Sequence, residues 1–260
     1  MRLDAQNIYA GYGPRNVLQD VSASLPDAAF TAVLGPNGSG KSTLLKVLAR
    51  LLRPAAGHAR LDGDNLFAMP RRRLARRLAL LPQHPAAPEG LTVRQLVGYG
   101  RYPYIGRFNT FSADDRRVIA RVMRQCELDG LAERPVGQLS GGERQRAWIA
   151  MALAQQPRVL LLDEPLSHLD INHQLEVMEL LQQLNAEQGL TTAIVLHDIN
   201  LALRFCDRLV VLREGRLAAE GPTGDILAGP VIDQTFGVAK QLVHAPDAPA
   251  PLCHFTRAPA

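Results

Sequence analysis

The sequence contains no apolar run long enough to cross a membrane. A helix that crosses a bilayer needs roughly 20 apolar residues, whereas the run at Val159–Leu162 ends at two acidic residues. Residues 1–7 also lack the apolar core of a secretory signal. We therefore expect a cytoplasmic chain that reaches a membrane only through a partner protein.

Cysteine is scarce as well. Cys126, Cys206 and Cys253 are odd in number and far apart, and none belongs to a CxxC pair. This spacing argues against disulfides and against a zinc site. We expect all three to be small apolar side chains of a protein from a reducing compartment.

Lysine is confined to Lys41, Lys46 and Lys240, so arginine carries nearly all of the basic charge, and the net charge is only +4. The densest arginine cluster spans residues 71–77 (RRRLARR). Contact with nucleic acid or anionic lipid is one interpretation, but no aromatic residues interleave with these arginines. A solvated helix face is the simpler interpretation, and we expect no nucleic-acid partner.

Short strand patterns alternate with helical ones along most of the chain. Residues 3–25 mix apolar alternation with turn residues, which is typical of antiparallel strands. The apolar runs at 30–34, 159–162 and 192–196 are typical of strands buried on both faces in a parallel sheet. The pattern predicts an α/β fold, with helices at 42–52, 144–155, 174–184 and 199–205 and a hairpin at 208–220.

The middle of the chain has a different character. Loops rich in Pro, Gly and Tyr precede a helical pattern in which residues 112–115 fit a capping box and Cys126 ends an apolar stripe. We predict one domain over 1–260, with a core at 1–83 and 157–236 and a mostly helical insertion at 84–156. For the tail at 237–260, an edge strand near 253–256 and partial disorder are both open.

Residues 35–43 (GPNGSGKST) fit the phosphate-binding pattern G-x-x-x-x-G-K-[ST] between a strand and a helix. The glycines let backbone N–H groups point at phosphates, and the following helix presents its positive end to the same anion. Lys41 supplies a mobile charge, and the Ser42 hydroxyl suits Mg²⁺. We predict ATP and Mg²⁺ as ligands, bound by Gly35, Pro36, Asn37, Gly38, Ser39, Gly40, Lys41, Ser42 and Thr43.

A second predicted strand, Val159–Leu162, ends in the adjacent carboxylates Asp163 and Glu164. Ligands of α/β proteins lie at the carboxyl ends of strands. We expect Asp163 to help hold Mg²⁺ through its water shell and Glu164 to polarise the attacking water as general base. Acidic residues here also serve as plain helix caps, so the assignment depends on the phosphate-binding loop.

Residues 139–143 (LSGGE) open another predicted helix. Ser140 and Glu143 alone fit a capping box. Two successive glycines are unfavourable in a first helical turn, however, whereas bare backbone N–H groups at a helix N-terminus bind anions. We therefore predict a second phosphate-binding helix terminus, formed by Ser140, Gly141 and Gly142.

In the order and spacing of these motifs, the chain resembles the ATP-binding-cassette (ABC) family over nearly its full length. The resemblance implies a P-loop NTPase (RecA-like) parallel-sheet core with an N-terminal antiparallel β region and an inserted helical subdomain. It also implies a head-to-tail dimer of two copies, in which Ser140–Gly142 of one copy cover the γ-phosphate held by the other. The matching segments are 35–43, Gln83, 139–143, 160–164, 167–170 and His197.

The resemblance implies four further roles. Asp170 would lie at the dimer seam, and His197 would contact the γ-phosphate and orient the general base. Gln83 would contact Mg²⁺ and report the nucleotide state to the helical insertion, and Tyr12 would stack on adenine. The alternatives are structural: a place beside a helix cap for His197, a polar strand end for Gln83 and packing on the core for Tyr12.

Several kinds of ABC protein compete. DNA-repair and chromosome ATPases need long coiled coils, and no sustained heptads occur. Ribosome-acting members usually carry two cassettes, and exporters often carry a fused membrane span. We expect the motor ATPase of a bacterial importer; a non-hydrolysing nucleotide sensor is the rival from another class.

Cargo and partner rest on a narrower resemblance. Residues 99–108, 144–152 and 196–202 resemble bacterial ferric-siderophore importers, with haem and vitamin B12 importers as alternatives. We expect exposed aromatic and arginine side chains in 99–108 to dock on a permease; a loop packed inside the insertion is the alternative. Permease contacts are expected between Gln83 and Phe108, at the cytoplasmic face of the inner membrane.

Overall fold

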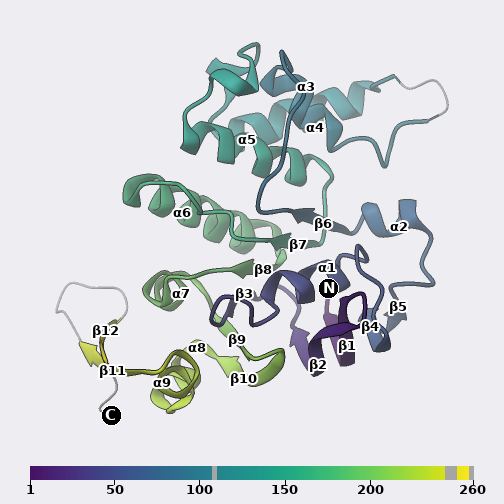
Figure 1. Cartoon of the computed structure of the whole chain (residues 1–260). Coiled ribbons are helices and arrows are strands. Elements are labelled where there is room, and N and C mark those ends of the chain that lie inside the picture. The colour runs from purple at the N-terminus through teal and green to yellow at the C-terminus, as the bar shows by residue number, and fades with distance from the viewer. Residues whose placement is uncertain (107–109, 244–250, 258–260) are drawn as a thin grey trace. The chain divides into compact units, whose positions relative to one another are not determined.

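The computed structural model describes residues 1–106, 110–243 and 251–257 (Figure 1). The chain forms two compact units. Unit 1 comprises Met1–Ala68 and Asn185–Ala260, and unit 2 comprises Met69–Leu184. Helix α6 (Ile171–Gln188) begins in unit 2, and its last turn belongs to unit 1.

Unit 1 begins with an antiparallel sheet in the order β2-β1-β4-β5, which confirms the expectation for residues 3–25. Leu3, Ile8 and Leu18 are fully buried on its inner face, as expected for a sheet with one covered face. The strands are β1 (Leu3–Tyr12), β2 (Arg15–Leu25), β4 (Ala56–Leu61) and β5 (Asp64–Asn65).

The core sheet of unit 1 is built on β3 (Phe30–Leu34), which pairs in parallel with β8 (Thr191–Val195) on one side and β9 (Arg208–Arg213) on the other. All residues of β3 and β8 are buried, as their continuous apolar runs predict. Strand β10 (Arg216–Pro222) is antiparallel to β9, which confirms the predicted hairpin.

The helices of unit 1 differ from prediction mainly at their ends. Helix α1 (Lys41–Leu48) stops short of residue 52, because Arg50 adopts a left-handed φ of 60°, which cannot continue a helix. Helix α7 (Ile199–Phe205) has the predicted bounds. Two short helices follow β10, namely α8 (Thr223–Ala228) and α9 (Val231–Phe236).

The tail forms a two-stranded antiparallel sheet of β11 (Val238–Val243) and β12 (Leu252–Arg257) (Figure 1). Of the two alternatives for the tail, a strand is therefore found at 253–256, and it belongs to a sheet of its own rather than to the edge of a larger one. Asn200 of α7 holds β12 in place, since its side-chain amide exchanges two hydrogen bonds with the backbone of Cys253. All three cysteines are free and buried.

Unit 2 contains the parallel strands β6 (Leu78–Leu81) and β7 (Val159–Leu162) together with helices. Capping boxes start three of these helices at Thr92, Ser112 and Ser140, the last two as predicted. Its helices are α2 (Arg71–Ala75), α3 (Val93–Tyr99), α4 (Ala113–Gln125), α5 (Gly141–Ala154) and most of α6, with 3₁₀ turns at Asp129–Leu131 and Val136–Gln138.

The chain is thus an α/β protein with parallel strand pairs and an N-terminal antiparallel sheet, as predicted. Unit 2 spans 69–184 and includes β6 and β7 as well as the helices, so its bounds are wider than those of the predicted insertion at 84–156. That insertion stays a prediction. Within the described ranges, no helix is both long and apolar enough to span a bilayer.

Candidate nucleotide-binding site

The phosphate-binding loop at 35–43 joins β3 to α1 in unit 1, and its first and last glycines are required by close packing. Gly35 has a φ of 150°, and a Cβ there would lie 2.2 Å from the carbonyl oxygen of Leu212. Gly40, the N-cap of α1, has a φ of 103°, and a Cβ there would lie 2.5 Å from Cδ2 of Leu18. The loop conformation therefore excludes side chains at both ends.

Lys41 lies inside this loop. Its side chain is 5% exposed, and its Nζ donates hydrogen bonds to the carbonyl oxygens of Gly35 (2.9 Å) and Pro36 (3.1 Å). Lysine is almost never this buried without an electrostatic reason. The ammonium and the N-terminus of α1 concentrate positive charge at one place, which suits a bound phosphate.

Tyr12, at the end of β1, is not a core residue. Its ring is 53% exposed, and its hydroxyl accepts a hydrogen bond from Lys46 Nζ at 3.3 Å. Packing on the core is therefore wrong as an explanation of Tyr12, whereas stacking on adenine stays a prediction.

His197 follows β8 and is exposed. The next residue, Asp198, caps α7, since its Oδ1 accepts hydrogen bonds from the N–H groups of Asn200 and Leu201. Capping is therefore the work of Asp198, and the role of His197 toward the γ-phosphate stays a prediction.

In unit 2, Gln83 and Glu164 lie in direct contact although 81 positions separate them. Gln83 Nε2 donates a hydrogen bond of 2.6 Å to Glu164 Oε2, and the Ser167 hydroxyl donates to the same oxygen at 3.4 Å. Glu164 adopts a φ of 49°, which costs roughly 1–2 kcal/mol for a residue with a Cβ. Such strain collects at functional sites.

Asp163 precedes this contact at the end of β7. Its side chain is buried, and its N–H donates to the carbonyl oxygen of Leu81 at 2.9 Å. Because β6 and β7 are paired in parallel, the amide of Gln83 and the carboxylates of Asp163 and Glu164 follow strand ends at the same edge of the sheet. Oxygen donors of this kind suit Mg²⁺.

The LSGGE segment forms the N-terminus of α5. Ser140 Oγ accepts from the Glu143 N–H at 3.2 Å, and the Glu143 carboxylate accepts from the Ser140 N–H at 2.8 Å. The hydrogen bond from the Ser140 backbone is the main reason that the pKa of Glu143 is lowered. Ser140 and Gly141 are exposed, whereas Gly142 is buried. Asp170, at the start of α6, is exposed.

The candidate residues thus fall into two groups, one in each unit. Unit 1 holds Tyr12, residues 35–43 and His197, and unit 2 holds Gln83, Asp163, Glu164, Ser140, Gly141, Gly142 and Asp170.

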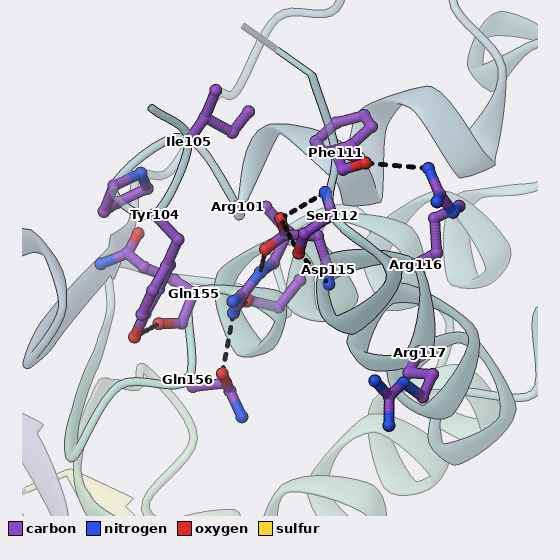
Figure 2. A network of polar contacts seen from close by, with 12 residues as sticks. Arg101, Tyr104, Ile105, Phe111, Ser112, Asp115, Arg116, Arg117, Gln155 and Gln156 are labelled. Carbon is purple, nitrogen blue, oxygen red and sulfur yellow. Dashed lines mark hydrogen bonds and ion pairs between the residues drawn. The ribbon is translucent and has the colours of Figure 1, made fainter. Parts of the chain in front are cut away.

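The expectation of exposed arginines in 99–108 is wrong for Arg101, which is 2% exposed. Its guanidinium donates to Asp115 Oδ1, the Ala154 carbonyl and Gln156 Oε1, each at 2.8 Å (Figure 2). No short-range pattern indicates this network, because the three acceptors lie 14 to 55 positions away. Arg107 and Phe108 lie outside the described residues.

Tyr104 packs beside Arg101. Its ring centroid lies 3.9 Å from the Arg101 guanidinium carbon, and its hydroxyl donates to the Gln155 carbonyl at 3.0 Å (Figure 2). Arg72 and Arg76 both donate to the Pro103 carbonyl. Arg101 and Tyr104 are therefore packed within unit 2, as the alternative had it. The arginines at 71–73 and 76 are exposed, as expected of a solvated face, and two of them also bond the 103–105 segment. Tyr102 is 53% exposed.

The fold and the phosphate-binding loop define a P-loop nucleotide-binding protein. Residues 18–167 match the family described as ABC transporter. The chain belongs to this family and is an ATPase. The relatives that it matches are named as ATP-binding proteins.

Two relatives illustrate the match. The ferric enterobactin transport ATP-binding protein of Escherichia coli (strain K12) is 43% identical over 96% of this chain and 93% of its own length. The hemin import ATP-binding protein of Bordetella pertussis (strain Tohama I) is 39% identical over 99% of this chain and 100% of its own length.

Solved structures of ABC transporter proteins also match this chain. A chain from an inward-facing, metal-chelate type ABC transporter superposes with a TM-score of 0.83 at 28% identity, over 98% of this chain and 96% of that one. A bacterial ABC transporter cassette solved as a dimer gives a TM-score of 0.75 at 30% identity, over 85% and 98% of the two chains.

The Arg101 network generates a stability prediction. Arg101→Met should lower the free energy of unfolding by about 3–5 kcal/mol, because it leaves the buried Asp115 carboxylate without its cation. Urea denaturation at pH 7 measures this. Arg94→Met removes the exposed pair with Glu133 and should cost at most about 1 kcal/mol. Equal losses for the two variants would contradict the prediction.

The same network predicts acid sensitivity. Burial opposes ionisation of Asp115, but hydrogen bonds from Ser112 and Arg101 outweigh it and lower the pKa of its carboxyl below 3.8. Its contribution to stability is therefore complete above pH 3.8 and is lost as the pH falls through the lowered pKa. Asp115→Asn should flatten this part of the curve of unfolding free energy against pH. An unchanged curve would contradict the assignment.

Proposed function

We propose that the chain is the ATP-hydrolysing motor subunit of a bacterial ABC importer for ferric siderophores. The observation that carries the motor assignment is the contact of Gln83 with Glu164 at the end of β7, where an attacking water needs a base. The cargo is supported by relatives such as the ferric enterobactin transport protein.

Unit 1 would bind the nucleotide. Lys41 and the backbone N–H groups of 35–43 would hold the phosphates, with Tyr12 against the adenine. His197 would contact the γ-phosphate. The buried ammonium and the Cβ-free ends of the loop support this assignment.

Of the expected Mg²⁺ ligands, unit 1 holds Ser42 and unit 2 holds Gln83 and Asp163; hydroxyl, amide and carboxylate oxygens are of the kind that Mg²⁺ binds. When bound, the ion neutralises charge on the transferred phosphoryl group. Glu164 takes the proton of the attacking water, and the hydrogen bond from Gln83 holds the carboxylate in a fixed orientation.

A second copy would complete the site. Ser140, Gly141 and Gly142 would contact the nucleotide of the partner copy, Ser140 through its hydroxyl and the two glycines through their backbone N–H groups, with Asp170 at the seam. The exposure of Ser140 and Gly141 at the N-terminus of α5 supports this, as does a cassette relative solved as a dimer. Two such termini would then clamp two ATP molecules, and hydrolysis would release the clamp.

A permease would dock between Gln83 and Phe108, at the cytoplasmic face of the inner membrane. The exposed ring of Tyr102 stacks on Tyr99, with centroids 5.1 Å apart, and offers an aromatic contact of the kind enriched in interfaces. The packed neighbours Arg101 and Tyr104 make this segment a firm support rather than a loose loop.

Haem is the second candidate cargo, favoured by the match to the hemin import protein over its whole length. None of the proposed site residues would contact the cargo, so the cargo has to be identified by measuring uptake. Deleting the gene in its bacterium and measuring uptake of ferric siderophore, haem and cobalamin would test the cargo. Loss of ferric siderophore uptake alone is expected; loss of haem or cobalamin uptake instead would overturn the assignment.

The proposed base gives a direct test of the sandwich. Glu164→Gln should bind ATP, lose hydrolysis by about a hundredfold or more and accumulate as a dimer with Mg-ATP, because the closed state is no longer released. Sedimentation velocity with and without nucleotide measures the dimer. A variant that stays monomeric at saturating Mg-ATP would contradict the proposal.

The phosphate-binding loop gives a second test. Lys41→Ala should abolish steady-state ATP turnover, because it removes the charge that would bind the phosphates. Lys240→Ala is the matched control: Lys240 Nζ bonds Asp233 and the Gly229 carbonyl, away from the loop, so turnover should stay near wild type. Near-normal turnover by Lys41→Ala would refute the assignment.

A further inference from the structure

The first turn of α5 lies against the start of α6, at a distance that only glycine permits. A Cβ on Gly142 would lie 2.3 Å from Cδ2 and 2.9 Å from Cγ of His173. A Cβ on Gly141 would lie 3.3 Å from Cδ2 of Leu169. The imidazole of His173 thus occupies the space where any other residue at 142 would begin its side chain.

Asp170 fixes the orientation of this imidazole. Its Oδ1 lies 2.8 Å from His173 Nδ1 and also accepts the His173 N–H at 2.9 Å. The hydrogen bond from the His173 backbone is the main reason that the pKa of Asp170 is lowered, so the carboxylate is ionised and can only accept. Nδ1 therefore carries the proton, and the opposite ring edge, Cδ2 and Nε2, faces Gly142.

A second contact holds the two helices together one turn further on. Arg146 of α5 donates to Glu176 Oε2 of α6 at 3.2 Å. The start of α5 is therefore tied to α6 twice, by a side-chain ion pair and by the ring against the Gly142 backbone.

We propose that His173 is a positioning residue for the α5 terminus: its ring sets the place of the Gly142 backbone, and Asp170 sets the ring. This rests on the proposed function, in which the terminus binds the nucleotide of a second copy. Oriented N–H groups are effective only where they are held in place. Loss of the ring should therefore weaken closure of the dimer, while nucleotide binding by 35–43 of the same copy is unaffected.

The test uses the full chain with Glu164→Gln, in which the ATP-bound dimer accumulates. Adding His173→Ala should raise the dimer dissociation constant by about tenfold. A misplacement of about 1 Å can lower a reaction rate about a hundredfold, and we expect a smaller effect on binding. ATP affinity of the dilute monomer should stay unchanged. Gln182→Ala, an exposed position further along the same helix, is the matched control and should leave the dimer intact.

His173→Asn separates the ring from its hydrogen bond. Its amide can still donate to Asp170 but lacks the ring edge that faces Gly142, so it should weaken the dimer as much as His173→Ala does. A full-strength dimer with either variant, or an equal loss of monomer ATP affinity, would overturn the inference. If Glu164→Gln alone stays monomeric, the proposed function itself fails, and the inference fails with it.

A double-mutant cycle tests the contact itself. Gly142→Ala should damage dimerisation strongly in the presence of His173, because the new methyl group meets the ring. In the His173→Ala background the same change should cost at least about fivefold less, since contacting residues are not additive. Additive losses would show that the ring does not set the place of Gly142.

Discussion

Parallel strand pairing is the constraint on which the candidate site depends. Parallel strands end at the same edge of a sheet, so the segments that follow them meet even when they are far apart in sequence. In unit 2 this places Gln83 after β6 within 2.6 Å of Glu164 after β7. In unit 1 it places the loop after β3 and His197 after β8 at the ends of paired strands. The candidate site residues therefore follow the carboxyl ends of the strands, and the segments between the strands determine how far apart these residues lie in the sequence.

Close backbone packing is the second constraint, and it gives the glycines different reasons. At Gly35 and Gly40, a Cβ would collide with Leu212 and Leu18, which are parts of the surrounding fold. At Gly142, the collision is with His173, a side chain that is itself held by hydrogen bonds to Asp170. A motif glycine can therefore serve anion binding and close packing together.

The sequence predicted the fold class, the buried strands and the capping boxes, because each depends on short-range patterns. Helix ends were less predictable, since α1 stops where Arg50 takes a left-handed conformation that no sequence pattern announces. Arg101 was misjudged for a different reason. An arginine among tyrosines is usual at a surface, and only the fold brings Asp115 and the Ala154 carbonyl to it.

The hydrogen bond between His173 and Asp170 could have been predicted from the sequence. A histidine three positions after an aspartate at a helix start can bond back to it, because residues i and i+3 share a helix face. What the sequence could not show was the other side of the ring, since Gly142 comes from another helix. Pairings of this kind depend on how helices pack, and a single sequence does not contain that information.

Side chains from other parts of unit 2 contact helix α5 at both of its ends. Near its start, Arg146 donates to Glu176 and the His173 ring lies against Gly142. The chain at its end receives hydrogen bonds from Arg101 at the Ala154 carbonyl and from Tyr104 at the Gln155 carbonyl. A helix of 14 residues is about 21 Å long. It is stiff along its axis because every turn is hydrogen-bonded. The packed segment around Arg101 and the glycine terminus therefore lie at opposite ends of one continuous hydrogen-bonded helix.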